Sequence, residues 1–160
     1  MEREDIADSE ILSRLVFNPP MYKNSTLIWK LIFEFQNNQC ESLIWHRHVG
    51  FSPAIAEVHA CGCRREAEKI VKARDLGKVP ATYVGAITAT AGAIQAYQNP
   101  NGHGFVVVHE PSEGREHVHV CYRSAPDTMT RGDKNELKLK LGEIFSDLDP
   151  HSCPAHPASQ

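Results

Sequence analysis

Runs of β-branched and aromatic residues predict the strands of this chain. The stretch 26–35, which reads TLIWKLIFEF, is rich in the residue types that favour extended backbone. Shorter runs predict further strands over 41–49, 82–88, 104–109 and 117–122. Residues 9–16 fit either a short helix or a strand. The two prolines at 19–20 end regular structure just after them.

Helical periodicity and end signals predict the helices. Ser52 followed by Pro53 is a typical helix start, and the helix is expected to run to Leu76 and stop at Gly77. Two more helices are predicted over 89–97 and 135–145. This mixed order predicts one α+β domain over residues 1–147, with a mainly antiparallel sheet and two or three helices. Residues 148–160 are expected to form a flexible tail.

Composition narrows the class of protein. Seventeen basic and twenty acidic residues give a net charge of −3, which disfavours a surface that binds nucleic acid throughout. No apolar run approaches the roughly 20 residues of a membrane span, and the acidic start lacks the features of a signal peptide. The cysteine count is odd, at five, which favours reduced thiols and a cytoplasmic location.

Three histidines carry the strongest chemical signal. His109 ends one predicted strand, and His117 and His119 occupy alternate positions of the next, so the latter two share a face. If the strands are neighbours, the three imidazoles converge on a site for a divalent metal such as zinc, manganese or magnesium. In that arrangement Arg115 is placed to bind an anionic substrate. The opposing interpretation is that His117 and His119 lie on the solvent face of an ordinary strand.

The stretch from His109 to His119 resembles the histidine core of HUH endonucleases, particularly plasmid relaxases. The resemblance covers about twenty residues. It implies that His117 and His119 are the paired ligands, that His109 is the third, and that a tyrosine attacks a phosphate of single-stranded nucleic acid. In relaxases that tyrosine lies near the N-terminus, which makes Tyr22 the candidate nucleophile. The opposing interpretation is that Tyr22 packs beside Trp29 as a half-buried aromatic residue.

A second similarity points to a different class of protein. RLVFNP at 14–19, ESL at 41–43 and the closing HVH motif resemble a pattern in small uncharacterised bacterial proteins. It implies a bacterial accessory protein that acts beside a protein partner. The lead hypothesis is therefore a metal-dependent phosphodiesterase or nuclease, and the rival is a non-catalytic accessory or protein-binding module. A third possibility is an oxygenase in which Glu110 or Glu116 joins His117 and His119 as a metal ligand.

Other chemistry-bearing residues give weaker signals. His59, Cys61 and Cys63 could form half of a zinc site, completed by Cys153 and a histidine of the tail, although small buried thiols are the commoner reading. His46 and His48 repeat the His-x-His pattern but fit an edge strand. The segment 99–104 is predicted to be a turn, from which His103 could reach the rim of the main site. The serines, Ser42, Ser112 and Ser124, lack the surroundings typical of a nucleophile.

Overall fold

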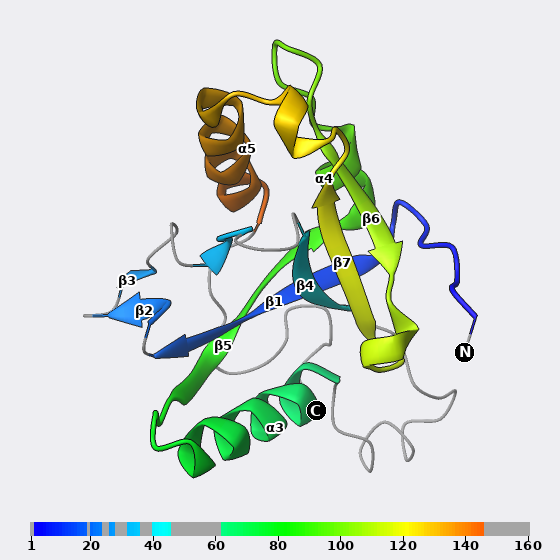
Figure 1. Cartoon of the computed structure of the whole chain (residues 1–160). Coiled ribbons are helices and arrows are strands. Elements are labelled where there is room, and N and C mark those ends of the chain that lie inside the picture. Colours follow the sequence, from blue (N-terminus) through cyan, green and yellow to red (C-terminus); the bar gives the residue numbers. More distant parts are fainter. Residues whose placement is uncertain are drawn as a thin grey trace.

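A five-stranded antiparallel sheet forms the centre of the protein (Figure 1). The computed structural model describes residues 2–18, 20–23, 26–27, 32–35, 40–45 and 62–145. The sheet order is β5-β1-β4-β7-β6, and all its pairings are antiparallel. Its strands are β1 (Ile11–Asn18), β4 (Cys40–Trp45), β5 (Thr82–Thr90), β6 (Phe105–His109) and β7 (His117–Tyr122).

The other elements pack around this sheet. The helices of the described residues are α3 (Gly62–Leu76), α4 (Ala91–Ala96) and α5 (Arg131–Ile144). Single 3-10 turns occur at η1 (Pro111–Glu113) and η2 (Pro126–Thr128), and β2 (Tyr22–Lys23) pairs with β3 (Thr26–Leu27) in a separate hairpin. The α+β class with a mainly antiparallel sheet is therefore confirmed. No helix among these residues is both long and apolar enough to cross a membrane.

The two faces of the sheet have separate apolar cores. On one face, side chains of the strands pack with α4, α5 and the segment 32–35. The opposite face packs against α3 in a smaller core formed by Leu15, Phe17, Ile44, Ala67 and Ala86. Figure 1 shows α3 and α5 on opposite sides of the strands. Because side chains alternate along each strand, the face that a residue occupies follows from its register.

Several predicted elements agree with the structure. One predicted strand and the predicted state of two cysteines need correction. The undecided stretch 9–16 is a strand, β1, and the two histidine-bearing strands are neighbours. The first predicted helix ends at Leu76 as expected, but residues 53–61 lie outside the described part of the chain. Residues 46–49 of the predicted second strand and the whole tail also lie outside it.

The predicted strand over 26–35 is the first correction. Only Thr26–Leu27 belongs to a strand, and the described residues 32–35 do not. Instead, Oε1 of Glu41 accepts hydrogen bonds from the backbone N–H groups of Glu34 and Phe35, at 2.7 and 2.6 Å. Phe35 also has a positive φ of 51°. The apolar side chains of this segment fill the core from a loop. The segment is therefore as rich in large apolar residues as a buried strand.

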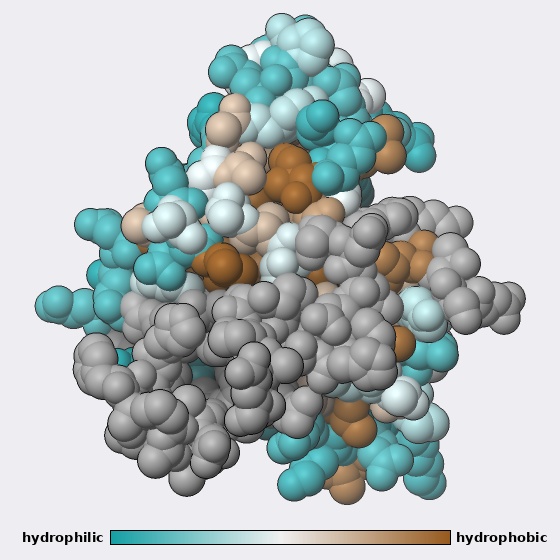
Figure 2. Space-filling model, turned by 180° about the vertical axis from the view of Figure 1, so that it is seen from behind, coloured by the Kyte–Doolittle hydropathy of each residue, from teal (hydrophilic) through white to brown (hydrophobic). Residues whose placement is uncertain are grey.

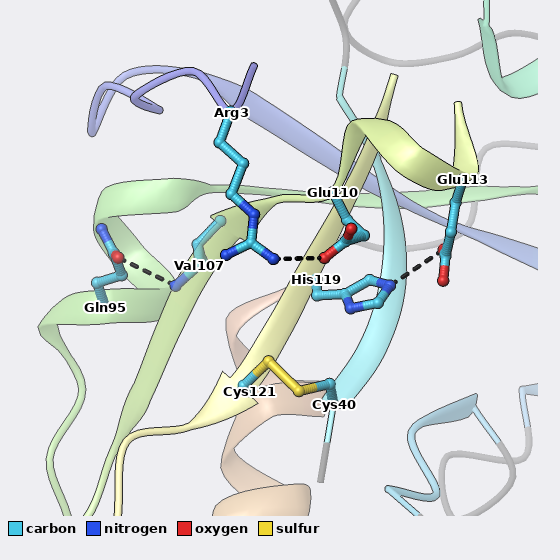
Figure 3. The surroundings of a disulfide bond; sticks show 8 residues. All are labelled: Arg3, Cys40, Gln95, Val107, Glu110, Glu113, His119 and Cys121. Carbon is cyan, nitrogen blue, oxygen red and sulfur yellow. Dashed lines mark hydrogen bonds and ion pairs between the residues drawn. A yellow bond between two sulfur atoms is a disulfide. The ribbon is translucent and has the colours of Figure 1, made fainter. Parts of the chain in front are cut away.

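The second correction concerns the thiols. Cys40 and Cys121 are directly opposite each other on β4 and β7 and form a disulfide (Figure 3). The expectation of reduced cysteines, on which the cytoplasmic prediction depended, is wrong for this pair. The sequence could not show it because the two residues are 81 positions apart. Only the pairing of β4 with β7 brings them together.

Candidate binding site

The structure separates the three histidines that the sequence pattern placed together. Residues paired across antiparallel strands share a face, and His109 pairs with Val118, which lies between His117 and His119 on β7. His109 therefore occupies the face that packs against α4 and α5, whereas His117 and His119 occupy the other. The expected convergence of three imidazoles is not found.

His109 is occupied by structural contacts. It is 1% exposed, and its ring packs edge-on against Trp45 at a centroid distance of 5.2 Å. The N–H of Glu4 donates to its Nδ1 at 3.0 Å, so the ring proton resides on Nε2, which donates to the carbonyl of Arg115 at 2.9 Å. Since both nitrogens are used, this neutral ring has no lone pair left for a metal. It holds the N-terminal segment and the η1–β7 turn against the sheet.

The remaining pair lies among carboxylates on the opposite face. Nε2 of His119 is 3.0 Å from Oε2 of Glu113, and Figure 3 shows this contact beside the disulfide. The same carboxylate oxygen is 3.6 Å from Nδ1 of His117, while Nε2 of His117 is 3.3 Å from Glu66 on α3. A Cβ on Gly114 would approach the His117 ring to 2.7 Å, so the turn fits closely around the imidazole.

Metal-ligand geometry is not found in this region. Glu66 and Glu113 contact different nitrogens of His117, so one ion cannot use all three groups. Among the described residues, no three histidine, cysteine, aspartate or glutamate side chains are arranged to hold a metal ion. Glu110, one of the two carboxylates predicted for this role, is bound by Arg3 at 3.0 Å and by Ser112 at 2.6 Å. The Ser112 hydrogen bond lowers the pKa of Glu110.

The two predicted catalytic residues are not assembled with the histidines. Tyr22 lies on β2, half-buried against the larger core, and Figure 1 places β2 well apart from η1 and the start of β7. Trp29, its expected neighbour, lies outside the described residues. Arg115 is exposed in the turn before β7, where its backbone carbonyl supports His109.

A cavity lies between α3 and the sheet. Its volume is about 280 Å³, close to the lower end of the range for small-molecule sites. The lining is mostly apolar, and His117 and Glu66 form part of its wall. The apolar residues of the lining are Leu15, Phe17, Met21, Ile44 and Ile70.

Within the described part of the chain, two buried polar atoms at this cavity make no hydrogen bond. Ser13 is fully buried on β1 and its Oγ has no hydrogen-bond partner, whereas Nδ1 of His117, a residue 8% exposed, makes no hydrogen bond but has Oε2 of Glu113 3.6 Å away. A buried polar group without a partner costs about 1–3 kcal/mol, so such groups are typically kept where something binds them. The cavity therefore combines a mostly apolar lining with one buried hydroxyl, that of Ser13, that makes no hydrogen bond.

Sequence reasoning missed a second cluster at the other end of the β6–β7 hairpin. Nδ1 of His103 is 2.7 Å from Oγ of Ser124, and its Nε2 is 3.6 Å from Oδ2 of Asp133. The three residues come from the loop before β6, the loop after β7 and the first turn of α5. In the sequence, Ser124 and His103 are unrelated candidates, and Asp133 is not a candidate. No spacing links them, because tertiary packing alone brings them together.

The remaining candidate histidines and cysteines have no side-chain position in the described part of the chain. His46, His48, His59, Cys61 and Cys153 lie outside the described residues. Cys63 belongs to α3, but no side-chain position is described for it. The proposed zinc half-site in this part of the chain therefore stays a prediction.

Comparisons with known proteins give no relative. No protein-family model, curated protein or solved structure matches this chain. The similarity to HUH endonucleases accordingly depends on the short histidine motif alone.

Proposed function

We propose that this chain is a binding module that holds a small amphipathic molecule in the cavity between α3 and the sheet. The observation that carries the proposal is the buried, unpaired Oγ of Ser13 in the mostly apolar cavity. A ligand with an apolar body and one hydroxyl or carboxylate would fill the space and satisfy that hydroxyl. Metal-dependent phosphodiester cleavage stays a prediction from the sequence motif, since His109 is separated from His117 and His119.

The composition of the cavity supports a ligand of this kind. Most of the lining surface is apolar, and β1, β4 and α3 contribute Leu15, Phe17, Ile44 and Ile70 to it, so desolvation of an apolar body provides the binding free energy. His117 and Ser13 supply directional contacts, which fix orientation more than they add affinity. Glu66 already pairs with His117. Arg14 and Arg74 also line the cavity, so its charges do not select between a hydroxyl and a carboxylate head group.

Ile70→Phe tests the proposal by filling the cavity from α3. Binding of octanol and of octanoate would be measured by ligand-observed NMR and by calorimetry on the full chain. We expect wild-type protein to bind at least one of them, and Ile70→Phe to weaken binding tenfold or more because the larger ring occupies the space. Leu139→Phe, at a side chain 66% exposed on α5, is the matched control and should bind as wild type.

Ser13→Ala separates a ligand contact from a structural one. Removing an unpaired buried hydroxyl should leave the unliganded protein as stable as wild type or more stable by about 1 kcal/mol. Affinity for the bound alcohol or acid should nevertheless fall. If neither compound binds, or if Ile70→Phe binds both as well as wild type, the cavity is not the site proposed.

A further inference from the structure

Ser124, His103 and Asp133 have the arrangement of a nucleophile, a base and an orienting carboxylate. The Ser124 hydroxyl is within hydrogen-bond distance of the imidazole, at 2.7 Å, and the far nitrogen of the ring faces Asp133 at 3.6 Å. A carboxylate only accepts hydrogen bonds, so it favours the tautomer with the ring proton on Nε2. That tautomer leaves the lone pair of Nδ1 free to accept the Ser124 proton. The ring is reversed relative to the usual serine triad, but the roles are equivalent.

A rigid network positions this cluster. Oδ1 of Asp133 accepts hydrogen bonds from the side chains of Asn99 and Asn101, at 3.0 and 2.8 Å. Oδ1 of Asn99 accepts from the backbone N–H of Asn101 and of His103, at 3.1 and 2.8 Å. The backbone around His103 is therefore fixed relative to α5, and the position of its ring does not depend on a mobile loop. The hydrogen bonds that Asp133 accepts, that from Asn101 foremost, lower its pKa to about 2, so the carboxylate is charged at neutral pH.

The loop that carries His103 passes close to the backbone of Tyr97. A Cβ at Gly104 would lie 2.5 Å from the carbonyl oxygen of Tyr97, so only glycine fits directly after His103. His103 and Ser124 are both partly exposed, with 14% of the His103 side chain accessible. Seen from behind, the upper end of the molecule, where α5 and this loop lie, is mainly hydrophilic (Figure 2). A small polar substrate can therefore reach the Ser124 hydroxyl from solvent.

We propose that Ser124 is a nucleophile toward small carboxylic esters, with His103 as its general base and Asp133 as a positioning residue. Oγ of Ser124 attacks the ester carbonyl carbon and its proton passes to Nδ1 of His103. The carbon–oxygen bond to the alcohol breaks, and the alcohol leaves with the proton from His103. Water then attacks the acyl-serine, giving up a proton to His103, and the acid is released as Ser124 regains its proton. This site lies at the opposite end of β6–β7 from the cavity, so either proposal can fail alone.

The test is covalent labelling of the full chain with a fluorophosphonate. Such a probe forms an oxygen–phosphorus bond with an activated serine and releases fluoride, and peptide mass spectrometry identifies the modified residue. We expect one adduct, on Ser124, and hydrolysis of p-nitrophenyl acetate that stops when the adduct forms. A general base typically contributes about 10²–10⁴-fold, so His103→Ala should label at least 100-fold more slowly. Added imidazole should restore part of the rate.

Matched variants keep the result interpretable. Ser124→Ala should lose the adduct and the esterase activity, whereas Ser112→Ala, at a partly exposed loop position between β6 and β7, should retain both. Circular dichroism melting would show that each variant is folded. If His103→Ala proves unfolded, Ser124→Ala and the site of labelling still decide the question. The proposal is overturned if wild-type protein gives no adduct, if the adduct is on another residue, or if folded His103→Ala labels as fast as wild type.

Discussion

At the residue scale, Arg14 shows how one buried charge ties together segments that are distant in sequence. Its guanidinium donates to the carbonyls of Ile32 and Ser42, each at 3.0 Å, and pairs with Glu41 at 3.3 Å. Burial lowers the pKa of Arg14, and the carboxylates of Glu41 and Glu34 oppose that shift. Because each of the three guanidinium nitrogens has an oxygen partner, the charge is compensated where it lies. The same Glu41 holds the 32–35 loop, so the two residues act as one unit.

Arg14→Ala is therefore expected to be strongly destabilising. Removing one partner of a buried ion pair typically costs about 3–5 kcal/mol, because the other charge stays buried and uncompensated. We expect a loss of about 3 kcal/mol in the free energy of unfolding, measured by urea denaturation. Arg115→Ala, at an exposed position, should change it by less than about 0.5 kcal/mol. A loss below 1 kcal/mol for Arg14→Ala would mean that water replaces the pair.

At the element scale, the first turn of α5 couples a helix cap to the chemistry of the Ser124 cluster. Thr130 Oγ1 accepts from the N–H of Asp133, and Oδ2 of Asp133 accepts from the N–H of Thr130, each at 3.0 Å. This capping box satisfies donors that every helix start leaves unpaired. Asp133 also receives the two asparagine side chains of the 99–103 loop. The Asp133 carboxylate thus binds the 99–103 loop, caps the start of α5 and faces His103.

Acid should reveal this coupling. The pKa of Asp133 is about 2 in the folded protein, below its ordinary value near 4, so its contribution to stability is present above pH 4 and lost as the pH falls from 4 to 2. The melting temperature of wild-type protein should fall over that interval. Asp133→Asn should melt lower at pH 6 and show a smaller fall between pH 4 and 2. Parallel melting curves for both proteins across the whole range would contradict this assignment.

At the scale of the whole molecule, the Cys40–Cys121 disulfide joins two residues that are 81 positions apart in the chain. It fixes β4 to β7, the two strands that contribute Ile44 and His117 to the cavity. A cross-link of this span restricts the unfolded chain far more than the folded one, and native disulfides typically contribute about 2–4 kcal/mol. The large apolar face of the sheet is packed by both α4 and α5, so the fold does not depend on the cross-link alone.

The Cys40→Ser/Cys121→Ser variant should remain folded but be less stable by about 2–4 kcal/mol in the absence of reductant. Peptide mapping of unreduced wild-type protein should show the two cysteines in one linked peptide pair. Under reducing conditions the difference in stability between variant and wild type should largely disappear. A difference that persists with reductant would show that the serines disturb packing rather than remove a bond.

The sequence by itself determined part of the local structure of this protein, although the strand predicted over 26–35 was wrong. Runs of β-branched and aromatic residues over 105–109 and 117–122, the glycine after Leu76 and the apolar spacing of α5 predicted their elements correctly, because such signals act between near neighbours. Tertiary structure alone decided which side chains meet. The register of β6 and β7 placed His109 on the other face of the sheet from His117 and His119. The pairing of β4 with β7 joined two cysteines. Loop and helix packing assembled His103, Ser124 and Asp133. Each outcome depends on contacts between residues far apart in the chain, for which a single sequence carries no periodic signal.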